Sequence, residues 1–562
     1  MSDQRPWLKN YPSGIPANIN EAEYATVVQM VEEVFKKYAD KTAFSCMGKE
    51  MSFTELDKQS RNFGAYLHSR GLEPGDKIAL MMPNLLQYPI ALFGALRAGL
   101  VVVNTNPLYT PREMLHQFND SGAKAIVIAE NFGANLQKIL PDTQIKTIIT
   151  TSIGELLGFP KKLIVNFVVR NIKKMVPKYD IPNTVSFGDA LSQGKKFTIK
   201  SFNGTADDVI FLQYTGGTTG VAKGAMLTNR NMVANMLQMK AWMAPYLTDA
   251  TVKQEVALCA LPLYHIFALT VNCLGIMAIG GMNTLVTNAR DIASVIKAIK
   301  SYPTSVISGV NTLYNAMMNH KDFESIDFGS FKIAVAGGMA LQRPVAERWQ
   351  KLTGSFLAEG YGMTECSPVA SANPFDAKIG RIGSIGLPLP STDMRIVDEQ
   401  GSVLAPGGIG EIQIKGPQVM KGYYNRPDAT AQTIVDGWLC TGDIGTMGED
   451  GFFQIVDRKK DMILVSGFNV YPNEIEDVVA GHPKVMEVAA VGIPDEKSGE
   501  VVKLFIVKKD PSLTEKEIIA YCRENMTGYK IPKAIEFKKE LPKTNVGKIL
   551  RRALREEENA KA

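Results

Sequence analysis

Residues 214–224 read Tyr-Thr-Gly-Gly-Thr-Thr-Gly-Val-Ala-Lys-Gly and are the most informative stretch of the chain. The four glycines let the backbone approach a ligand closely, and successive N–H groups of such a loop can converge on an anion. Three threonine hydroxyls and the charge of Lys223 complete a set suited to phosphate. The Walker A spacing is not met, because Gly224 follows Lys223. Taken alone, the stretch is a phosphate loop or a surface turn with a solvated lysine.

The residues around this loop predict alternating strands and helices. Residues 211–214 form the end of an expected strand, and residues 231–243 an expected helix. Further strands are expected at 77–82, 101–104 and 125–129, and helices at 88–96, 111–118 and 132–139. Such alternation is typical of βαβ units with largely parallel sheets.

Two changes of pattern toward the C-terminus indicate further units. From about residue 394, short strands alternate with glycine-rich turns, which predicts a β-rich subdomain over about 394–457. A charged junction at 458–461 precedes about 100 residues, the length of a compact domain. We therefore predict an α/β fold with a large N-terminal domain of α/β layers and the β-rich subdomain (1–457), a hinge (458–461) and a small α+β domain (462–562).

Composition limits the class of protein. The 562 residues are 45% hydrophobic and 21% charged, as in a soluble protein of more than one domain. The net charge of +5 comes from 62 basic and 57 acidic residues, a balance that argues against a nucleic-acid partner. Six scattered cysteines and an N-terminus without an apolar run predict a cytoplasmic protein. The uncharged residues 256–289 are interrupted by Pro262 and Gly280, so we expect a buried strand and helix there.

Two helical patterns have more than one interpretation. Residues 161–178 predict a helix with Ile164, Val165 and Val168 on an apolar face and Lys162, Asn166 and Arg170 on a polar face. Such a helix either lies on the cytoplasmic face of a membrane or packs on the domain with its basic face in water. The second pattern is four methionines on one face of the 231–243 helix, which is either core packing or the lining of an acyl site: Met232, Met236, Met239 and Met243.

Several motifs follow the 214–224 loop in a recognisable order. They read Leu261-Pro-Leu-Tyr-His-Ile-Phe267, Ala336-Gly-Gly338, Glu359-Gly-Tyr-Gly-Met-Thr-Glu365, Gly437-Trp-Leu-Cys-Thr-Gly-Asp443 running into Val456-Asp-Arg-Lys-Lys-Asp461, and Pro542-Lys-Thr-Asn-Val-Gly-Lys548. Together they resemble the adenylate-forming enzymes, which include acyl-CoA synthetases, luciferase-like enzymes and adenylation domains of peptide synthetases. Residues 81–97, 106–122 and 459–478 are similar to bacterial ligases for long-chain fatty acids, so the resemblance covers nearly the whole chain.

The resemblance implies what the 214–224 loop binds. A fatty carboxylate attacks the α-phosphorus of ATP and expels pyrophosphate, so two anions must be neutralised. The resemblance assigns the β- and γ-phosphates to Thr215, Gly216, Gly217, Thr218, Thr219, Gly220 and Lys223. It assigns Mg²⁺ to Glu365, because a carboxylate suits a hard cation that also binds water and phosphate oxygens. Alone, Thr364-Glu365 is an ordinary pair at a helix N-terminus.

The same resemblance implies the other nucleotide contacts. Thr364 hydrogen-bonds the α-phosphate, and adenine lies against Tyr361. Asp443 and Arg458 hold the ribose hydroxyls, one accepting and the other donating hydrogen bonds. Singly, these two are a turn residue and a linker charge. Backbone around the adenine comes from Gly338, Glu359 and Gly360.

The resemblance also assigns the catalytic and moving parts. Lys548 matches the lysine that bridges the attacking carboxylate and the ATP oxygens, and His265 lines the carboxylate site, although a lone histidine in an apolar stretch is otherwise a core residue. Lys460 matches the hinge on which a mobile C-terminal domain pivots between half-reactions. Gly467 and Phe468 then line the path of CoA.

Together these features predict an enzyme that activates long-chain fatty acids with ATP, Mg²⁺ and CoA, for fatty acid degradation. A fatty acyl-AMP ligase and a CoA ligase for a medium-chain or aryl acid are the alternatives within the superfamily. From another class, a non-catalytic lipid-binding protein is considered because of residues 161–178. Lys223, Glu365 and Lys548 argue against that alternative. The preferred chain length and a homodimeric state stay open at this stage.

Overall fold

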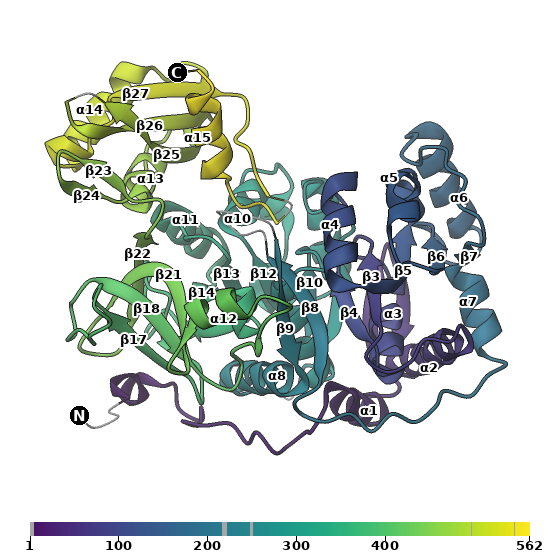
Figure 1. Ribbon diagram of the computed structural model, residues 1–562. Coiled ribbons are helices and arrows are strands. Elements are labelled where there is room, and N and C mark those ends of the chain that lie inside the picture. Colours follow the sequence, from purple (N-terminus) through teal and green to yellow (C-terminus); the bar gives the residue numbers. More distant parts are fainter. Residues whose placement is uncertain (1–4, 216–221, 248–250, 496, 545, 562) are drawn as a thin grey trace.

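The computed structural model describes residues 5–215, 222–247, 251–495, 497–544 and 546–561. Two large sheets with helices on their faces form the N-terminal part, and a smaller antiparallel sheet lies beside them (Figure 1). A separate unit of strands and helices, yellow-green to yellow in Figure 1, contains the C-terminus. The predicted α/β fold, with a large N-terminal domain and a small C-terminal α+β domain, is therefore confirmed.

An eight-stranded sheet carries the residues that flank the 214–224 loop. Its order is β19-β9-β8-β4-β3-β5-β6-β7, and neighbours from β8 to β7 are parallel. The strands are β3 Lys77–Met81, β4 Val101–Asn104, β5 Ala123–Ala129, β6 Thr147–Thr151, β7 Val185–Ser186, β8 Val209–Thr215, β9 Lys223–Thr228 and β19 Gly422–Tyr423. Helices around it are α2 Phe53–Ser69, α3 Gln87–Arg97, α4 Pro111–Ser121, α5 Gly133–Ile139 and α7 Phe187–Gly194. The elements predicted between residues 77 and 139 are all present, because their apolar runs are buried on both sides of a parallel sheet.

The 214–224 loop lies at the end of a strand, as predicted, but it leads into a second strand. Thr215 of β8 lies opposite Lys223 of the antiparallel strand β9. The predicted helix follows only after β9, as α8 Asn229–Met243, whose first turn is capped by the side chain of Thr228. The sequence does not reveal β9, because Lys-Gly-Ala-Met-Leu-Thr has no clear alternation of apolar and polar residues.

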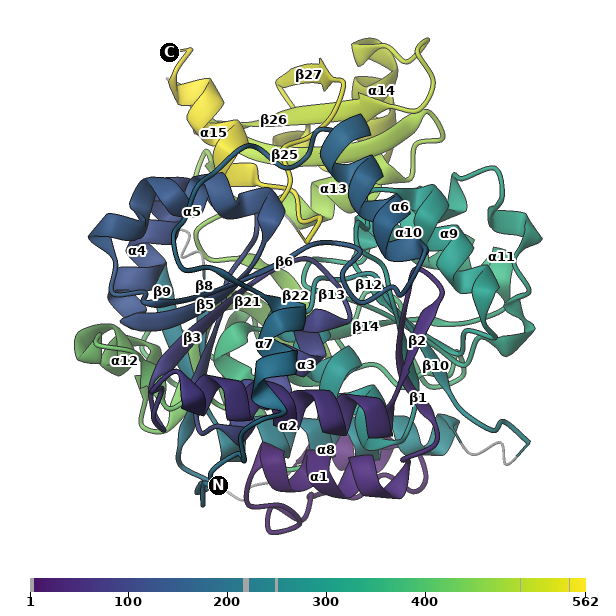
Figure 2. The same cartoon turned by 90° about the vertical axis from the view of Figure 1, so that its right-hand side faces the viewer.

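A nine-stranded sheet forms the other half of the N-terminal part (Figure 2). Its order is β16-β15-β14-β13-β12-β10-β11-β1-β2. The strands are β1 Thr42–Cys46, β2 Lys49–Ser52, β10 Val256–Cys259, β11 Met282–Leu285, β12 Val306–Gly309, β13 Ile333–Gly337, β14 Leu357–Gly362, β15 Val369–Ala372 and β16 Leu387–Pro388. Helices of this half are α1 Val27–Lys37, α9 Ile292–Ser301, α10 Asn311–Met318 and α11 Arg343–Thr353.

The uncharged stretch of residues 256–289 is buried within this half, as predicted. It forms β10, a π-type helix at Ala268–Ile276 and β11, and every residue of these three elements is buried. Within the residues that the structure describes, no helix is long and apolar enough to cross a membrane.

Two five-stranded sheets complete the fold. In the antiparallel one, β22 joins the path β17-β18-β21-β20, with β17 Asp393–Val397, β18 Gly410–Lys415, β20 Ile434–Val435, β21 Trp438–Met447 and β22 Phe453–Arg458; α12 Pro427–Thr433 precedes β20. In the C-terminal one, β27 joins β24-β23-β26-β25, with β23 Ile463–Val465, β24 Phe468–Val470, β25 Val485–Asp495, β26 Gly499–Lys508 and β27 Ala534–Lys538. Its helices are α13 Pro472–Ala480, α14 Glu515–Asn525 and α15 Arg551–Asn559. Residues 459–462 separate the two sheets and overlap the predicted junction.

The C-terminal domain contacts the N-terminal part through hydrogen bonds from α10 and the start of α11. The backbone N–H of Arg343 donates to Asp477 Oδ1 (2.8 Å), and Asn315 Nδ2 donates to the backbone carbonyl of Met486 (3.0 Å). Thr312 Oγ1 donates to the carbonyl of Gly547 at 3.0 Å. This last contact brings the loop that carries Lys548 against the start of α10.

The segment 161–178 attaches to the domain through part of its predicted polar face, while Ile164 of its predicted apolar face is exposed. It forms α6 Lys161–Phe167 and a π-type turn at Val168–Ile172. Asn166, predicted on the solvated face, is buried, and Arg170 pairs with Glu130 at 2.7 Å. The polar side chains hold the helix on the domain, since Asn166 Oδ1 accepts from the backbone N–H of Gly154 and its Nδ2 donates to a serine hydroxyl.

Candidate active site

One cavity collects the side chains of the predicted motifs. It has a volume of about 1410 Å³ and lies between the two large sheets, the antiparallel sheet and the C-terminal domain. The predicted site residues that line it are Thr215, His265, Gly338, Glu359, Gly360, Tyr361, Thr364, Glu365, Asp443, Arg458, Lys460 and Lys548. Residues that are far apart in the sequence thus face one space. Of the other predicted phosphate contacts, Gly216, Gly217, Thr218, Thr219 and Gly220 lie outside the described residues.

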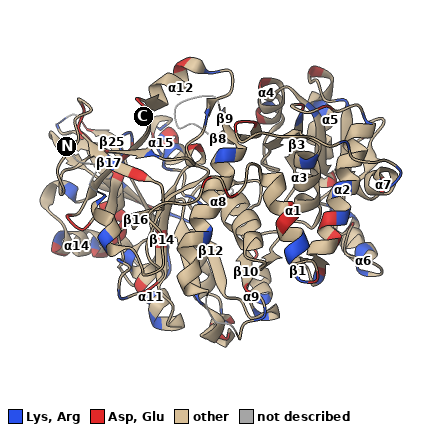
Figure 3. Ribbon diagram, turned by 90° about the horizontal axis from the view of Figure 1, so that it is seen from below, with Lys and Arg blue, Asp and Glu red and all other residues tan. Residues whose placement is uncertain are grey.

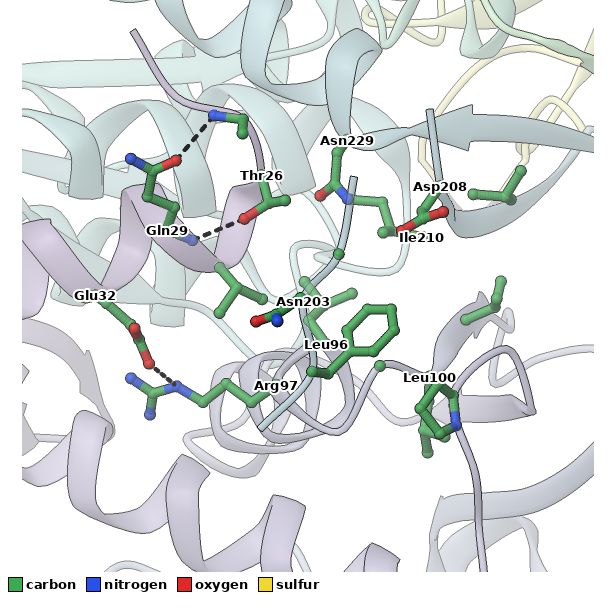
Figure 4. Close-up of a pocket in the computed structure, with 18 of the residues that line it drawn as sticks. Thr26, Gln29, Glu32, Leu96, Arg97, Leu100, Asn203, Asp208, Ile210 and Asn229 are labelled. Carbon is green, nitrogen blue, oxygen red and sulfur yellow. Dashed lines mark hydrogen bonds and ion pairs between the residues drawn. The ribbon is translucent and has the colours of Figure 1, made fainter. Parts of the chain in front are cut away.

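A second cavity contains none of the predicted residues. It has a volume of about 900 Å³ and lies between α1, the end of α3 and residues 202–210 (Figure 4). Its arginine, Arg97, already pairs with Asp57 at 2.5 Å and with Glu32 at 3.5 Å. We therefore place the candidate active site in the larger cavity.

The edge of the eight-stranded sheet connects Lys223 to the predicted metal ligand. Lys223 begins β9, and its Nζ lies 5.0 Å from the centroid of the Tyr423 ring. The hydroxyl of Tyr423 donates to Glu365 Oε1 at 2.7 Å. Lys223, Tyr423 and Glu365 therefore form one row of side chains. The motifs do not indicate Tyr423, because β19 joins β9 through a pairing between residues almost 200 positions apart.

Glu365 has the environment of a carboxylate that lacks a counter-ion. It is buried, and none of the ion pairs among the described residues includes it. Burial raises the pKa of its carboxyl above the usual range, against the hydrogen bond from Tyr423 and the charge of Lys223. A divalent cation beside Glu365 would offset this cost, so the residues present fit Mg²⁺.

Three predicted nucleotide contacts are joined in the structure. Tyr361 on β14 donates its hydroxyl to Asp443 Oδ2 at 2.6 Å. Arg458 Nε lies 3.4 Å from Asp443 Oδ1, because β21 and β22 place these two residues opposite each other. Nearby, burial raises the pKa of Glu359 to about 8, although its Oε1 accepts from the backbone N–H of Leu341 at 3.0 Å.

Lys548 lies inside the cavity and alters the charge state of its surroundings. Its backbone N–H donates to Thr544 Oγ1 at 3.0 Å within a turn closed by Lys543 and Ile549. Desolvation lowers the pKa of Lys548 to about 8, and the charge of Arg458 acts in the same direction. Desolvation, with the nearby charge of Lys548, also lowers the pKa of His265 to about 3. His265 is therefore a neutral imidazole at pH 7, able to donate one hydrogen bond and accept another.

The predicted hinge residue lines this cavity, whereas the predicted CoA-path residues do not. Lys460 lines it, and desolvation lowers its pKa to about 8. Gly467 and Phe468 are exposed outside it, where the Phe468 ring stacks on Tyr529 with centroids 4.7 Å apart. In this arrangement the C-terminal domain presents Lys548 to the cavity and Gly467 and Phe468 to solvent.

The methionine stripe of α8 is core packing with one exception. Met232, Met236 and Met243 are buried in the hydrophobic core. Met239 is buried and also lines the cavity. Only this methionine supports the interpretation of the stripe as the lining of an acyl site.

Replacing Gly338 with alanine is expected to displace Lys548. Gly338 has φ +80°, and a Cβ there would stand 3.1 Å from Lys548 Cε. Left-handed backbone costs an alanine about 1–2 kcal/mol, so we expect the melting temperature to fall by a few degrees and adenylation to fall at least about tenfold. Gly354→Ala is the matched control, because Gly354 has φ +72° with open space around its Cβ. Equal activity in the two variants would contradict the contact.

The geometry defines a class: a two-domain α/β protein in which the smaller domain places a lysine in a cavity lined mostly by the larger one. The chain matches the family model "AMP-binding enzyme" over residues 31–424 and "AMP-binding enzyme C-terminal domain" over 474–548. This chain belongs to the AMP-binding enzyme family.

Similar full-length proteins and solved structures agree with this family. The "Long-chain-fatty-acid--CoA ligase" of Salmonella typhimurium is 56% identical over 99% of both chains, and that of Bacillus subtilis is 38% identical over 99% of both. The ATP-bound MatB of Rhodopseudomonas palustris has a TM-score of 0.80 and 27% identity over 94% of this chain and 98% of its own. The anthranilate CoA ligase AuaEII shares the fold, with a TM-score of 0.85, 24% identity and coverage of 97% and 99%.

Proposed function

We propose that this protein is a long-chain-fatty-acid–CoA ligase that forms an acyl-adenylate. A carboxylate oxygen of the fatty acid attacks the α-phosphorus of ATP, and the bond to the leaving pyrophosphate breaks. The CoA thiolate then attacks the acyl carbonyl, AMP leaves, and the thiol proton passes to solvent. The observation that carries the proposal is the position of Lys548 beside Gly338, in a cavity lined by Tyr361 and Asp443. The names of the full-length relatives support the choice of acid.

The charges of the cavity support specific roles in the first half-reaction. The ammonium of Lys548 stabilises the negative charge that develops between the carboxylate and the α-phosphate. Lys223 holds the departing pyrophosphate, together with Thr215. His265 lines the carboxylate site without adding a charge, because its pKa lies far below neutrality. Thr364 donates its hydroxyl to the α-phosphate.

The remaining contacts hold and orient the nucleotide. Asp443 and Arg458 bind the ribose hydroxyls, and their ion pair fixes both side chains before ATP arrives. Tyr361 supports the adenine and orients Asp443 through its hydroxyl. Glu365 would hold Mg²⁺, with Tyr423 fixing the carboxylate. When bound, the metal neutralises phosphate charge and polarises the phosphoryl oxygens.

The two half-reactions require the small domain to present two faces in turn. We place its limits at 1–457 and 462–562, with the antiparallel sheet as the β-rich subdomain and the hinge at 458–461. Lys460 pivots, Lys548 leaves the cavity after adenylation, and Gly467 and Phe468 enter along the path of CoA. The exposed position of Phe468 in the present arrangement supports this assignment.

A single substrate comparison tests the proposal. We expect pyrophosphate release with oleate to exceed release with octanoate and with benzoate, and AMP to form in stoichiometric amounts with acyl-CoA when CoA is added. Acyl-AMP that accumulates unchanged in the presence of CoA would indicate a fatty acyl-AMP ligase. Preference for benzoate would indicate an aryl-CoA ligase, a candidate because a feruloyl-CoA synthase of Amycolatopsis is 33% identical over 92% of this chain. No pyrophosphate with any acid would refute the enzyme.

A further inference from the structure

A cluster of large apolar side chains projects into solvent from the segment around α6. The cluster consists of Phe159, Leu163, Ile164, Phe167, Ile172 and Met175. Their exposed fractions lie between 54% and 87%, and six such side chains within 17 residues are the densest group of exposed large apolar residues among those that the structure describes. A contiguous cluster of this kind marks an interaction site. We call it the α6 patch.

The α6 patch is exposed because polar contacts on the opposite side attach the helix to the domain. Asn166 and Arg170 make these contacts, and the backbone carbonyl of Met175 accepts a hydrogen bond from Asn131. Val165, Val168 and Val169 are half-buried, whereas the apolar side chains of the patch are exposed. They are available to a partner without any unfolding.

Charge around the patch narrows the choice of partner. Residues 159–178 contain six basic and no acidic residues, and only Arg170 of the six is in an ion pair among the described residues. On other helices, such as α1 and α2, basic and acidic residues occur together (Figure 3). The other five are lysines that flank the apolar cluster: Lys161, Lys162, Lys173, Lys174 and Lys178.

We propose that the α6 patch docks the protein onto an anionic lipid bilayer. The apolar side chains enter the boundary between headgroups and acyl chains, and the lysines contact lipid phosphates. A second copy of the chain is the weaker partner, because a two-fold interface pairs the same surface of both copies and would bring the lysines together. This docking is independent of the ligase activity.

The position of the patch relates it to the cavity. In Figures 1 and 2, α6 rises at the same end of the N-terminal part as the C-terminal domain. The active-site cavity opens between that domain and the N-terminal part. The patch and that domain lie toward one end of the molecule, with α6 on the right and the C-terminal domain on the left of Figure 1.

Vesicle co-sedimentation of the full chain tests the proposal. We expect binding to phosphatidylcholine vesicles with about 30% phosphatidylglycerol to exceed binding to pure phosphatidylcholine by at least about tenfold. The variant Leu163→Gln, Ile164→Gln, Ile172→Gln should lose at least about tenfold of this binding. A charge variant, Lys162→Gln, Lys173→Gln, Lys174→Gln, should lose the preference for the anionic vesicles.

Controls separate docking from folding and from self-association. Val403→Gln with Ile409→Gln removes two other exposed apolar side chains and should bind vesicles like the wild type. All variants should keep the melting temperature and the vesicle-free ATP–pyrophosphate exchange rate of the wild type. Unchanged vesicle binding in the apolar variant would overturn the proposal. So would an apolar variant that turns a dimer into a monomer in sedimentation velocity without weakening vesicle binding.

Discussion

Replacement of Lys548 by alanine is expected to lower adenylation at least about 10²-fold while supplied acyl-adenylate still reacts with CoA. The ammonium of Lys548 lies in the cavity beside Gly338 and is desolvated, so its charge acts in a poorly screened environment. A donor placed where charge develops is worth about 3–4 kcal/mol. ATP–pyrophosphate exchange measures the first half-reaction, and thioester formation from synthetic oleoyl-AMP measures the second.

The neighbouring lysine Lys543 provides the matched control. Its Nζ lies 2.6 Å from Glu487 Oε1, so Lys543 already forms an ion pair with a neighbouring carboxylate. Lys543→Ala should keep most of the exchange activity. Equal loss of both half-reactions in Lys548→Ala would mean that the residue supports the fold or the whole site, and the proposed role would be wrong.

Lys548 is also expected to make the rate of adenylation fall at alkaline pH. Adenylation needs the protonated ammonium, and the pKa of Lys548 is lowered to about 8 from its usual value of 10.5. The positive charge is therefore lost as pH rises through about 8, and kcat/KM for ATP, which reports the free enzyme, should fall there. His265 contributes no limb between pH 5 and 9, because its pKa is about 3. Lys548→Ala should abolish the limb at pH 8 in the residual activity.

The elements that the sequence predicts best are those whose signal is local. The strands at 77–82, 101–104 and 125–129 are continuous apolar runs, and parallel strands buried on both faces need such runs. The motifs converge on one cavity because they lie at strand ends and tight turns, where glycine allows a close approach, as at Gly338. Their order along the chain, compared with a known family, was needed to identify their partners.

The features that the sequence does not predict depend on distant contacts. Tyr423 reaches Glu365 only because β19 adds to β9 across almost 200 residues, and no local pattern encodes that pairing. The attachment of 161–178 through its polar face depends on one buried amide, Asn166, and one ion pair, Arg170 with Glu130. A helical wheel ranks side chains by polarity, but a satisfied hydrogen-bond network can bury the polar face instead.

Glu365→Gln is expected to lower adenylation at least about 10²-fold without lowering the melting temperature. The variant removes the carboxylate charge that a divalent cation needs but keeps the shape of the side chain. Burial raises the pKa of Glu365, which means that the ionised form is less stable in the folded than in the unfolded protein. A neutral amide removes that cost at neutral pH, so stability should stay equal or rise. The two measurements are ATP–pyrophosphate exchange over a magnesium titration and thermal unfolding without ligands.

Tyr423→Phe tests whether the row from Lys223 to Glu365 positions that carboxylate. The lost hydrogen bond to a charged group is worth about 1.5–3 kcal/mol, so we expect roughly tenfold slower exchange. The hydroxyl of Tyr423 favours the ionised form of Glu365, so its removal should raise the pKa of that carboxyl. We therefore expect kcat/KM to begin to fall at a higher pH on the acid side of the profile. The adjacent Tyr424→Phe should leave the limb in place, since Tyr424 contacts Lys77 instead. An equal shift in both variants would show that the fall in kcat/KM at low pH does not report Glu365. A purely structural effect of either substitution would lower the rate without changing the pH at which kcat/KM falls.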